Sequence, residues 1–175
     1  MRKRFVAFAA LAVVALAVAA CDDAPESGRA TIVVTNINNG SPLESDVSTD
    51  SLVYEDLVPV SFLSRPYNQF ITAPRGDAII EKYRIEWART DGGTGTLATR
   101  EEITSIFVPV DGTASGVIRL VSWQDKSGPV LGPLVGTNNV IAMTATITFF
   151  AREVGTEHDI ETQAVVGVHF ADTAN

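Results

Sequence analysis

The sequence has very few of the residues that most catalytic and metal sites require. Its 175 residues include one cysteine, Cys21, and two histidines, His158 and His169. A single cysteine cannot close a disulfide within the chain, and the two histidines lack the spacing of paired zinc ligands. No nucleophile motif accompanies either histidine, so we predict that the protein is not an enzyme.

Basic residues are also scarce. The chain has 13 Lys and Arg against 21 Asp and Glu, which gives a formal net charge of −8. Because Arg2, Lys3 and Arg4 stand together at the start, the remainder of the chain is more acidic still. Proteins that bind nucleic acid need a basic surface, so nucleic acid is not an expected partner. The folded surface is equally unsuited to anionic lipid, and solubility is the simplest role of its acidity.

Long apolar runs are absent except directly after these basic residues, from Phe5 to Ala20. A basic start, an apolar stretch and small residues form the pattern of a secretory signal. The run ends in Val18-Ala19-Ala20-Cys21, which resembles the lipobox of bacterial lipoproteins. The resemblance implies cleavage before Cys21 by signal peptidase II and a covalent diacylglycerol on its sulfur. The mature protein would then be attached to a membrane through Cys21.

An uncleaved signal anchor that crosses the membrane as one helix is the alternative. Cleavage is favoured because the alanine-rich run is shorter than the roughly 20 apolar residues that a spanning helix needs. We therefore expect a signal peptide at residues 1–20, a lipidated tether at 21–29 and one domain at 30–175. The expected location is the bacterial cell envelope, with the domain facing the periplasm or the exterior.

Alternation of apolar and polar residues predicts β-strands through most of the expected domain. We expect strands at residues 30–37, 58–62, 82–87, 103–110, 117–123, 140–150 and 160–170. The last two are expected to form a hairpin, and residues 117–123 are expected to pair with 103–110 across a loop at 111–116. Because Pro59 cannot donate to a ladder, its strand is expected at an edge or to begin near Pro59.

About seven short strands predict an all-β fold after the N-terminal signal helix. The architecture expected is a two-sheet antiparallel sandwich that is immunoglobulin-like or fibronectin-III-like, and a closed barrel is the alternative. Residues 144–150 and 166–172 resemble the terminal hairpin of exported bacterial lipoproteins with immunoglobulin-like domains. This resemblance implies a fold and no activity.

One expected loop combines a cation, aromatic rings and an amide. Its candidate binding residues are Arg65, Tyr67, Asn68 and Phe70. Arginine and tyrosine are enriched where proteins bind one another, and aromatic rings with amides also suit carbohydrate. Packing of the two rings against the edge of the sandwich is the alternative.

Acidic residues gather between the first two expected strands. Asp46, Asp50 and Asp56 are candidate ligands for calcium, which takes six to eight oxygen atoms. A solvated acidic loop is the alternative, since like-charged loop residues usually face water.

The expected function is a binding or structural role at the envelope, of the protein-interaction or adhesion type. A carbohydrate- or calcium-binding module is the alternative, and an enzyme ranks third. The expected partners are the membrane, through the lipid on Cys21, and an envelope protein or glycan. No cofactor is expected beyond that lipid.

Overall fold

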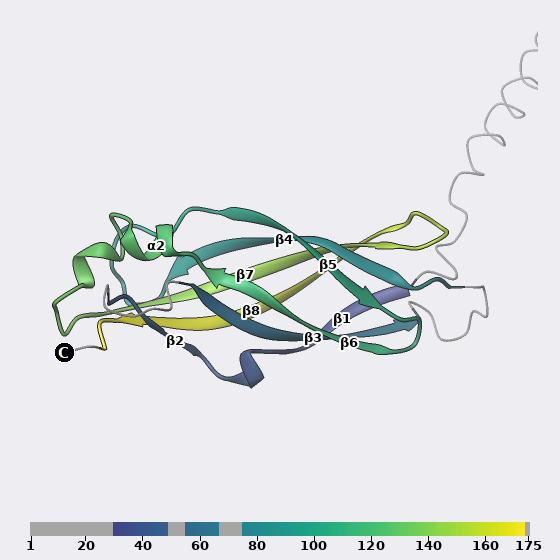
Figure 1. Cartoon of the computed structure of the whole chain (residues 1–175), viewed down its shortest axis with the longest axis horizontal. Coiled ribbons are helices and arrows are strands. Elements are labelled where there is room, and N and C mark those ends of the chain that lie inside the picture. The colour runs from purple at the N-terminus through teal and green to yellow at the C-terminus, as the bar shows by residue number, and fades with distance from the viewer. Residues whose placement is uncertain (1–29, 49–54, 67–74, 174–175) are drawn as a thin grey trace, which may run out of the picture.

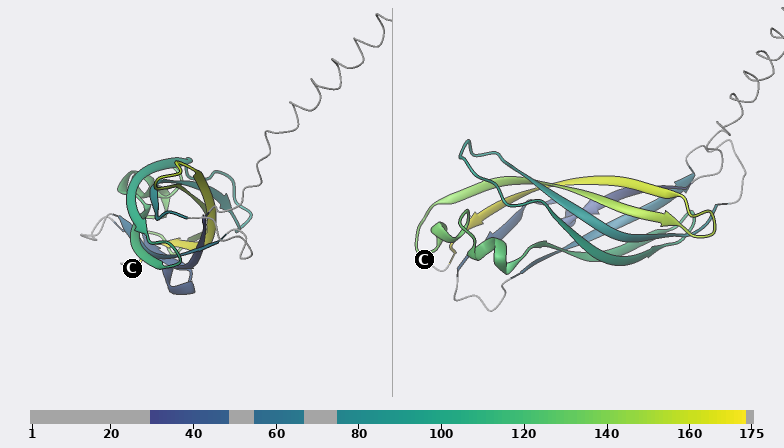
Figure 2. Two further views of the ribbon diagram at one scale, coloured as in Figure 1. Left: turned by 90° about the vertical axis from the view of Figure 1, so that its right-hand side faces the viewer. Right: turned by 90° about the horizontal axis from the view of Figure 1, so that it is seen from above.

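The protein folds into two β-sheets that face each other along a common long axis (Figures 1 and 2). The structure, a computed structural model, describes residues 30–48, 55–66 and 75–173. One sheet has the strand order β1 (Ala30–Ile37), β3 (Asp56–Pro66), β6 (Thr113–Val121). The other has the order β2 (Leu43–Asp46), β8 (Asp159–Ala171), β7 (Val140–Glu153), β4 (Ala78–Arg89), β5 (Arg100–Val108).

The strands give the molecule two ends. We call one end the N-terminal pole, because β1 begins there, together with the β5–β6 connection at 109–112 and the β7–β8 turn at 154–158 (Figure 1). The opposite end, the distal pole, holds the short helix α2 (Trp123–Ser127) and the 3₁₀ turn Gly132–Leu134. At a rise of about 3.3 Å per residue, β7 alone spans about 45 Å between the poles.

The predicted inward and outward faces are confirmed. In β4, Tyr83, Ile85 and Trp87 are buried while Lys82 and Glu86 are exposed. In β7 and β8 the buried side chains alternate in the same way. Phe62 of one sheet meets Phe149 of the other edge to face, with ring centroids 5.0 Å apart, so aromatic packing joins the two sheets.

The predicted C-terminal hairpin is also confirmed. β7 and β8 pair antiparallel from Val140 opposite Ala171 to Arg152 opposite Asp159. These are long strands, and the alternation that defines their faces continues over nearly their whole length. The local pattern was therefore sufficient to predict both strands and their pairing.

The predicted pairing of residues 103–110 with 117–123 is wrong. β5 pairs with β4, and β6 pairs with β3 in the other sheet. The connection at 109–112 crosses from one sheet to the other at the N-terminal pole, and the expected loop residues 113–116 belong to β6. Asp111 has a φ of 53°, the left-handed conformation that aspartate tolerates in tight turns. A sheet-crossing turn and a hairpin turn have the same local signature.

Of the two alternatives predicted for the strand around Pro59, the edge position is wrong and the start near Pro59 is confirmed. β3 begins at Asp56 and is the central strand of its sheet. The ladder with β1 ends at the pair Ile37–Val60, so β1 does not extend beside Pro59. Pro59 faces only Val117 of β6, and its missing N–H leaves no partner on β1 unsatisfied.

The described residues form eight strands, and β2 is the one that was not predicted. This four-residue strand has the sequence Leu-Glu-Ser-Asp and shows little apolar alternation. It pairs parallel to residues 168–171 of β8, whereas an all-antiparallel sandwich was expected. The described residues thus show an all-β, sandwich-like fold with one short parallel pair. No helix within them is long and apolar enough to cross a membrane.

Candidate functional site

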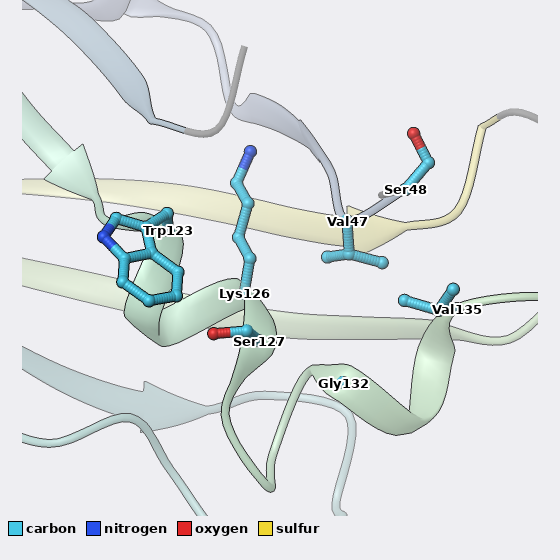
Figure 3. Close-up of a pocket in the computed structure, with 7 residues that line it drawn as sticks. All are labelled: Val47, Ser48, Trp123, Lys126, Ser127, Gly132 and Val135. Atoms are coloured by element: carbon cyan, nitrogen blue, oxygen red, sulfur yellow. The ribbon is translucent and has the colours of Figure 1, made fainter. Parts of the chain in front are cut away.

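A pocket of about 370 Å³ opens at the distal pole. It lies between α2, the 3₁₀ turn and the residues that follow β2 (Figure 3). Its walls are mainly apolar, and Lys126 stands between Trp123 on one side and two valines on the other. The lining residues are Val47, Ser48, Trp123, Lys126, Ser127, Gly132 and Val135. The volume lies within the range of small-ligand sites.

Helix α2 positions the pocket's tryptophan. The Ser122 hydroxyl accepts a hydrogen bond from the Asp125 N–H, and the Asp125 carboxylate accepts one from the Ser122 N–H, which forms a capping box. Arg100 of β5 forms an ion pair with the same carboxylate. This short helix is therefore fixed to the sheet, and Trp123 in its first turn is held with 51% of its surface exposed.

Lys126 is buried below the pocket. Only 8% of the residue is exposed, and its ammonium group donates to the Asp46 carbonyl (2.8 Å) and to the Asp56 carboxylate (2.9 Å). Asp56 also accepts a hydrogen bond from the buried Ser45 hydroxyl. Because the lysine charge is compensated by Asp56, the floor of the pocket is close to electrically neutral.

Two of the three candidate calcium ligands have other partners. Asp56 is paired with Lys126, and Asp46 accepts hydrogen bonds from Ser48 (2.9 Å) and from the Thr173 N–H (3.2 Å). Partial burial alone would raise the pKa of Asp46, but these hydrogen bonds outweigh burial and lower it. Asp50 lies outside the described residues. Among the residues that are described, no three His, Cys, Asp or Glu side chains come together as metal ligands.

The predicted binding loop lies mostly outside the described residues. Arg65 is an exposed residue of β3 near the N-terminal pole, about as far from the pocket as the strand length allows. Tyr67, Asn68 and Phe70 are not among the described residues, and neither is Cys21. The structure therefore does not bring Arg65 to the pocket, and the predicted roles of the other four residues stay predictions.

A second polar cluster lies where β5 and β6 approach each other without pairing. The Tyr83 hydroxyl accepts from the Arg119 N–H (3.1 Å) and donates to the Glu102 carboxylate (3.0 Å). The Arg119 guanidinium contacts Glu102 (3.0 Å) and Glu55 (2.8 Å). Burial, and then the charge of Glu102, raise the pKa of Tyr83 to about 12. The polar groups of this cluster bind one another, and the Tyr83 hydroxyl also binds the backbone at the free edge of β6. The cluster therefore joins the two sheets.

A second hollow, of about 430 Å³, lies on the outer face of the five-stranded sheet. It is lined in part by Lys82, Phe150 and Glu161. The Lys82 ammonium lies 4.9 Å from the centre of the Phe150 ring and therefore covers this ring, the main apolar group of the hollow. This hollow offers less apolar contact than the distal pocket.

Sequence reasoning missed the pocket because its walls come from distant segments. Trp123 was assigned to the end of a strand, and Lys126 was not singled out. The spacing of Ser122 and Asp125 was the available signal, since a hydroxyl residue followed three positions later by an acidic residue is a helix-capping pattern.

Comparison of the sequence with protein-family models finds no matching family, and comparison with curated proteins finds no match. The functional interpretation therefore depends on the N-terminal sequence and on the geometry of the described residues.

Proposed function

We propose that this protein is a lipid-anchored binding module of the bacterial envelope that holds a protein partner at its distal pole. The anchor is argued from the sequence, because Val18-Ala19-Ala20-Cys21 resembles a lipobox and directly follows an apolar run. The binding site is argued from the pocket between α2 and the residues after β2. We further propose that the sandwich is of the immunoglobulin-like type.

The observation that supports this function best is the position of the pocket. β1 begins at the N-terminal pole, and the pocket lies at the other end of strands about 45 Å long. A domain attached through the residues before β1 would hold the pocket away from the membrane. In that orientation a partner in the periplasm or the exterior can reach the pocket.

The chemistry of the pocket favours an apolar side chain of a protein partner. Trp123 is half-exposed at its edge, and tryptophan is among the residues that contribute most at protein interfaces. Val47 and Val135 supply aliphatic walls. The neutralised Lys126 leaves no strong charge to attract an ionic ligand, and its engagement with Asp56 also favours binding over catalysis.

A carbohydrate is the second candidate, because the exposed indole of Trp123 offers a face on which a sugar ring can stack. The Ser48 and Ser127 side chains line the same pocket and supply hydroxyl groups. A calcium function has less support, since Asp46 and Asp56 have partners within the domain.

Photo-crosslinking in cells tests the proposed function. A photoreactive residue is placed at Val135, on the pocket, and as a control at Val165, which is exposed on the outer face of β8. We expect a discrete protein adduct from position 135 that is lost in the Trp123→Ala variant, and no such adduct from position 165. Adducts from both positions, or an adduct that is insensitive to Trp123→Ala, would contradict a protein partner at this pocket.

The same variants distinguish the carbohydrate alternative. If no protein adduct forms, the intrinsic fluorescence of the protein is titrated with soluble cell-wall glycan fragments. A saturable change that Trp123→Ala abolishes would favour the carbohydrate function over the protein-binding function.

A further inference from the structure

We infer that the N-terminal pole rests on the membrane surface, with Val110 and Val154 placed in the headgroup region of the bilayer. The inference rests on the proposed function, since it takes the lipid on Cys21 as the primary attachment. It adds a second contact, between the folded domain and lipid, and thereby an orientation of the domain.

Two exposed valines lie at this pole. Val110 is 39% exposed in the β5–β6 connection, and Val154 is 48% exposed in the β7–β8 turn. The backbone of both valines is hydrogen-bonded to Asp77. The Val110 N–H donates to the Asp77 carboxylate (2.8 Å), and the Val154 N–H donates to the Asp77 carbonyl (2.7 Å). Asp77 therefore holds the two turns that carry these valines side by side at this pole.

A third exposed apolar side chain lies near this end of β5. Phe107, with 55% of its surface exposed, is the penultimate residue of β5 and pairs with Ile79 of β4. Apolar side chains in neighbouring turns suit the boundary between headgroups and acyl chains. Exposed single valines are common on protein surfaces, but these two valines share Asp77 as the hydrogen-bond partner of their N–H groups.

Two ion pairs of the domain lie near these valines, and the carboxylates of Asp77 and Glu153 there accept hydrogen bonds from backbone N–H groups. Arg75 contacts Asp111 at 2.6 Å, and Arg152 contacts Glu157 at 2.9 Å. The pole consequently has no excess of basic groups that would attract anionic lipid, in keeping with the acidic composition of the chain. The contact is therefore apolar, and we expect it to occur on an uncharged bilayer and to persist in high salt.

The chain outside the described residues determines which pole meets the membrane. β1 begins at Ala30, and the strand β3 beside it is joined to the β5–β6 connection by the bond from the Ser64 N–H to the Gly112 carbonyl (2.9 Å). Residues 21–29 can span at most about 30 Å when fully extended. The N-terminal pole is thus kept close to the lipid, where two valines that would bind a membrane weakly on their own have a high effective concentration.

Site-specific labelling of the lipidated full-length protein tests the inference. Lipidation leaves Cys21 without a free thiol, so Val110→Cys, Val154→Cys and the distal-pole control Val140→Cys each introduce a single labelling site. Each variant carries an environment-sensitive fluorophore and is reconstituted on phosphatidylcholine vesicles with and without nitroxide lipids labelled near the headgroup. Sedimentation with the vesicles and intact mass report the anchor separately.

We expect blue-shifted emission and quenching by nitroxide lipid at positions 110 and 154, unchanged in high salt, and neither effect at position 140. If the protein sediments with vesicles but the probes at 110 and 154 remain in water, the inference fails while the anchor stands. Probes that are shielded from water yet not quenched by lipid would show a protein contact and would also overturn it. A protein that carries no lipid and does not sediment overturns both proposals.

Discussion

Replacement of Lys126 by methionine is expected to destabilise the protein far more than replacement of an exposed lysine. The Lys126 and Asp56 side chains are only 9% and 14% exposed and lie 2.9 Å apart. Removal of one partner from a fully buried pair costs about 3–5 kcal/mol, because the remaining charge is left uncompensated. Asp56 keeps its hydrogen bond from Ser45 and some contact with water. We therefore expect a loss of about 2–3 kcal/mol for Lys126→Met.

The assay is urea unfolding followed by intrinsic fluorescence, with Lys82→Met as the matched control. Lys82 pairs with Glu101 at 3.3 Å, but both side chains are more than 40% exposed, and such pairs contribute about 0–1 kcal/mol. A cycle with Asp56→Asn should show that the double variant loses less stability than the sum of the single variants. The reasoning is refuted if Lys126→Met costs no more than Lys82→Met, or if the cycle is additive.

Two further predictions concern other buried groups. Glu153 is fully buried, and its carboxylate accepts hydrogen bonds from the Gly76 N–H (2.7 Å) and the Thr156 hydroxyl (2.8 Å). Glu153→Gln should therefore lower the free energy of unfolding in urea by about 1–2 kcal/mol. Unchanged stability would contradict this anchoring role. Tyr83 should ionise near pH 12 in the folded protein, whereas its pKa in the unfolded chain is about 10. Its contribution to stability is therefore complete below pH 10 and is lost as the pH rises toward 12. Ultraviolet titration should show this late step for one of the three tyrosines, and Tyr83→Phe should remove it; a Tyr83→Phe titration identical to that of the wild type would argue against the assignment.

The sequence was sufficient to predict elements whose partners are close in the chain. The alternation around Tyr83 and Trp87 predicts which face of β4 is buried, because neighbouring side chains in a strand point to opposite sides. The β7–β8 hairpin follows from two long alternating segments joined by a short polar turn. In both cases the information is local.

The pairing of β5 and β6 could not be predicted in the same way. The connection through Asp111 and Gly112 is compatible with a hairpin and with a crossing between sheets. The outcome depends on β3, which pairs with β6 although the two lie about fifty residues apart. Such a choice is made by packing between distant segments, which local alternation does not encode.

The pocket could not be predicted for a similar reason. Lys126 has the sequence context of an exposed lysine in a short helix, and it is buried only because Asp56, 70 residues earlier, lies beside it. Val47 and Val135 line the same side of the pocket and come from segments before β3 and after β6. The proposed anchor, by contrast, rests on a contiguous motif, so the proposal for Cys21 could be made from the sequence alone.

Intact mass and membrane partitioning of the protein expressed in a bacterium, compared with Cys21→Ser, test the central claim most directly. The account predicts that the wild type begins at Cys21, carries a lipid mass increment and sediments with membranes, and that Cys21→Ser lacks the lipid and is released. A wild-type protein without lipid, or a Cys21→Ser variant that stays in the membrane fraction to the same extent, would contradict the lipid-anchored account.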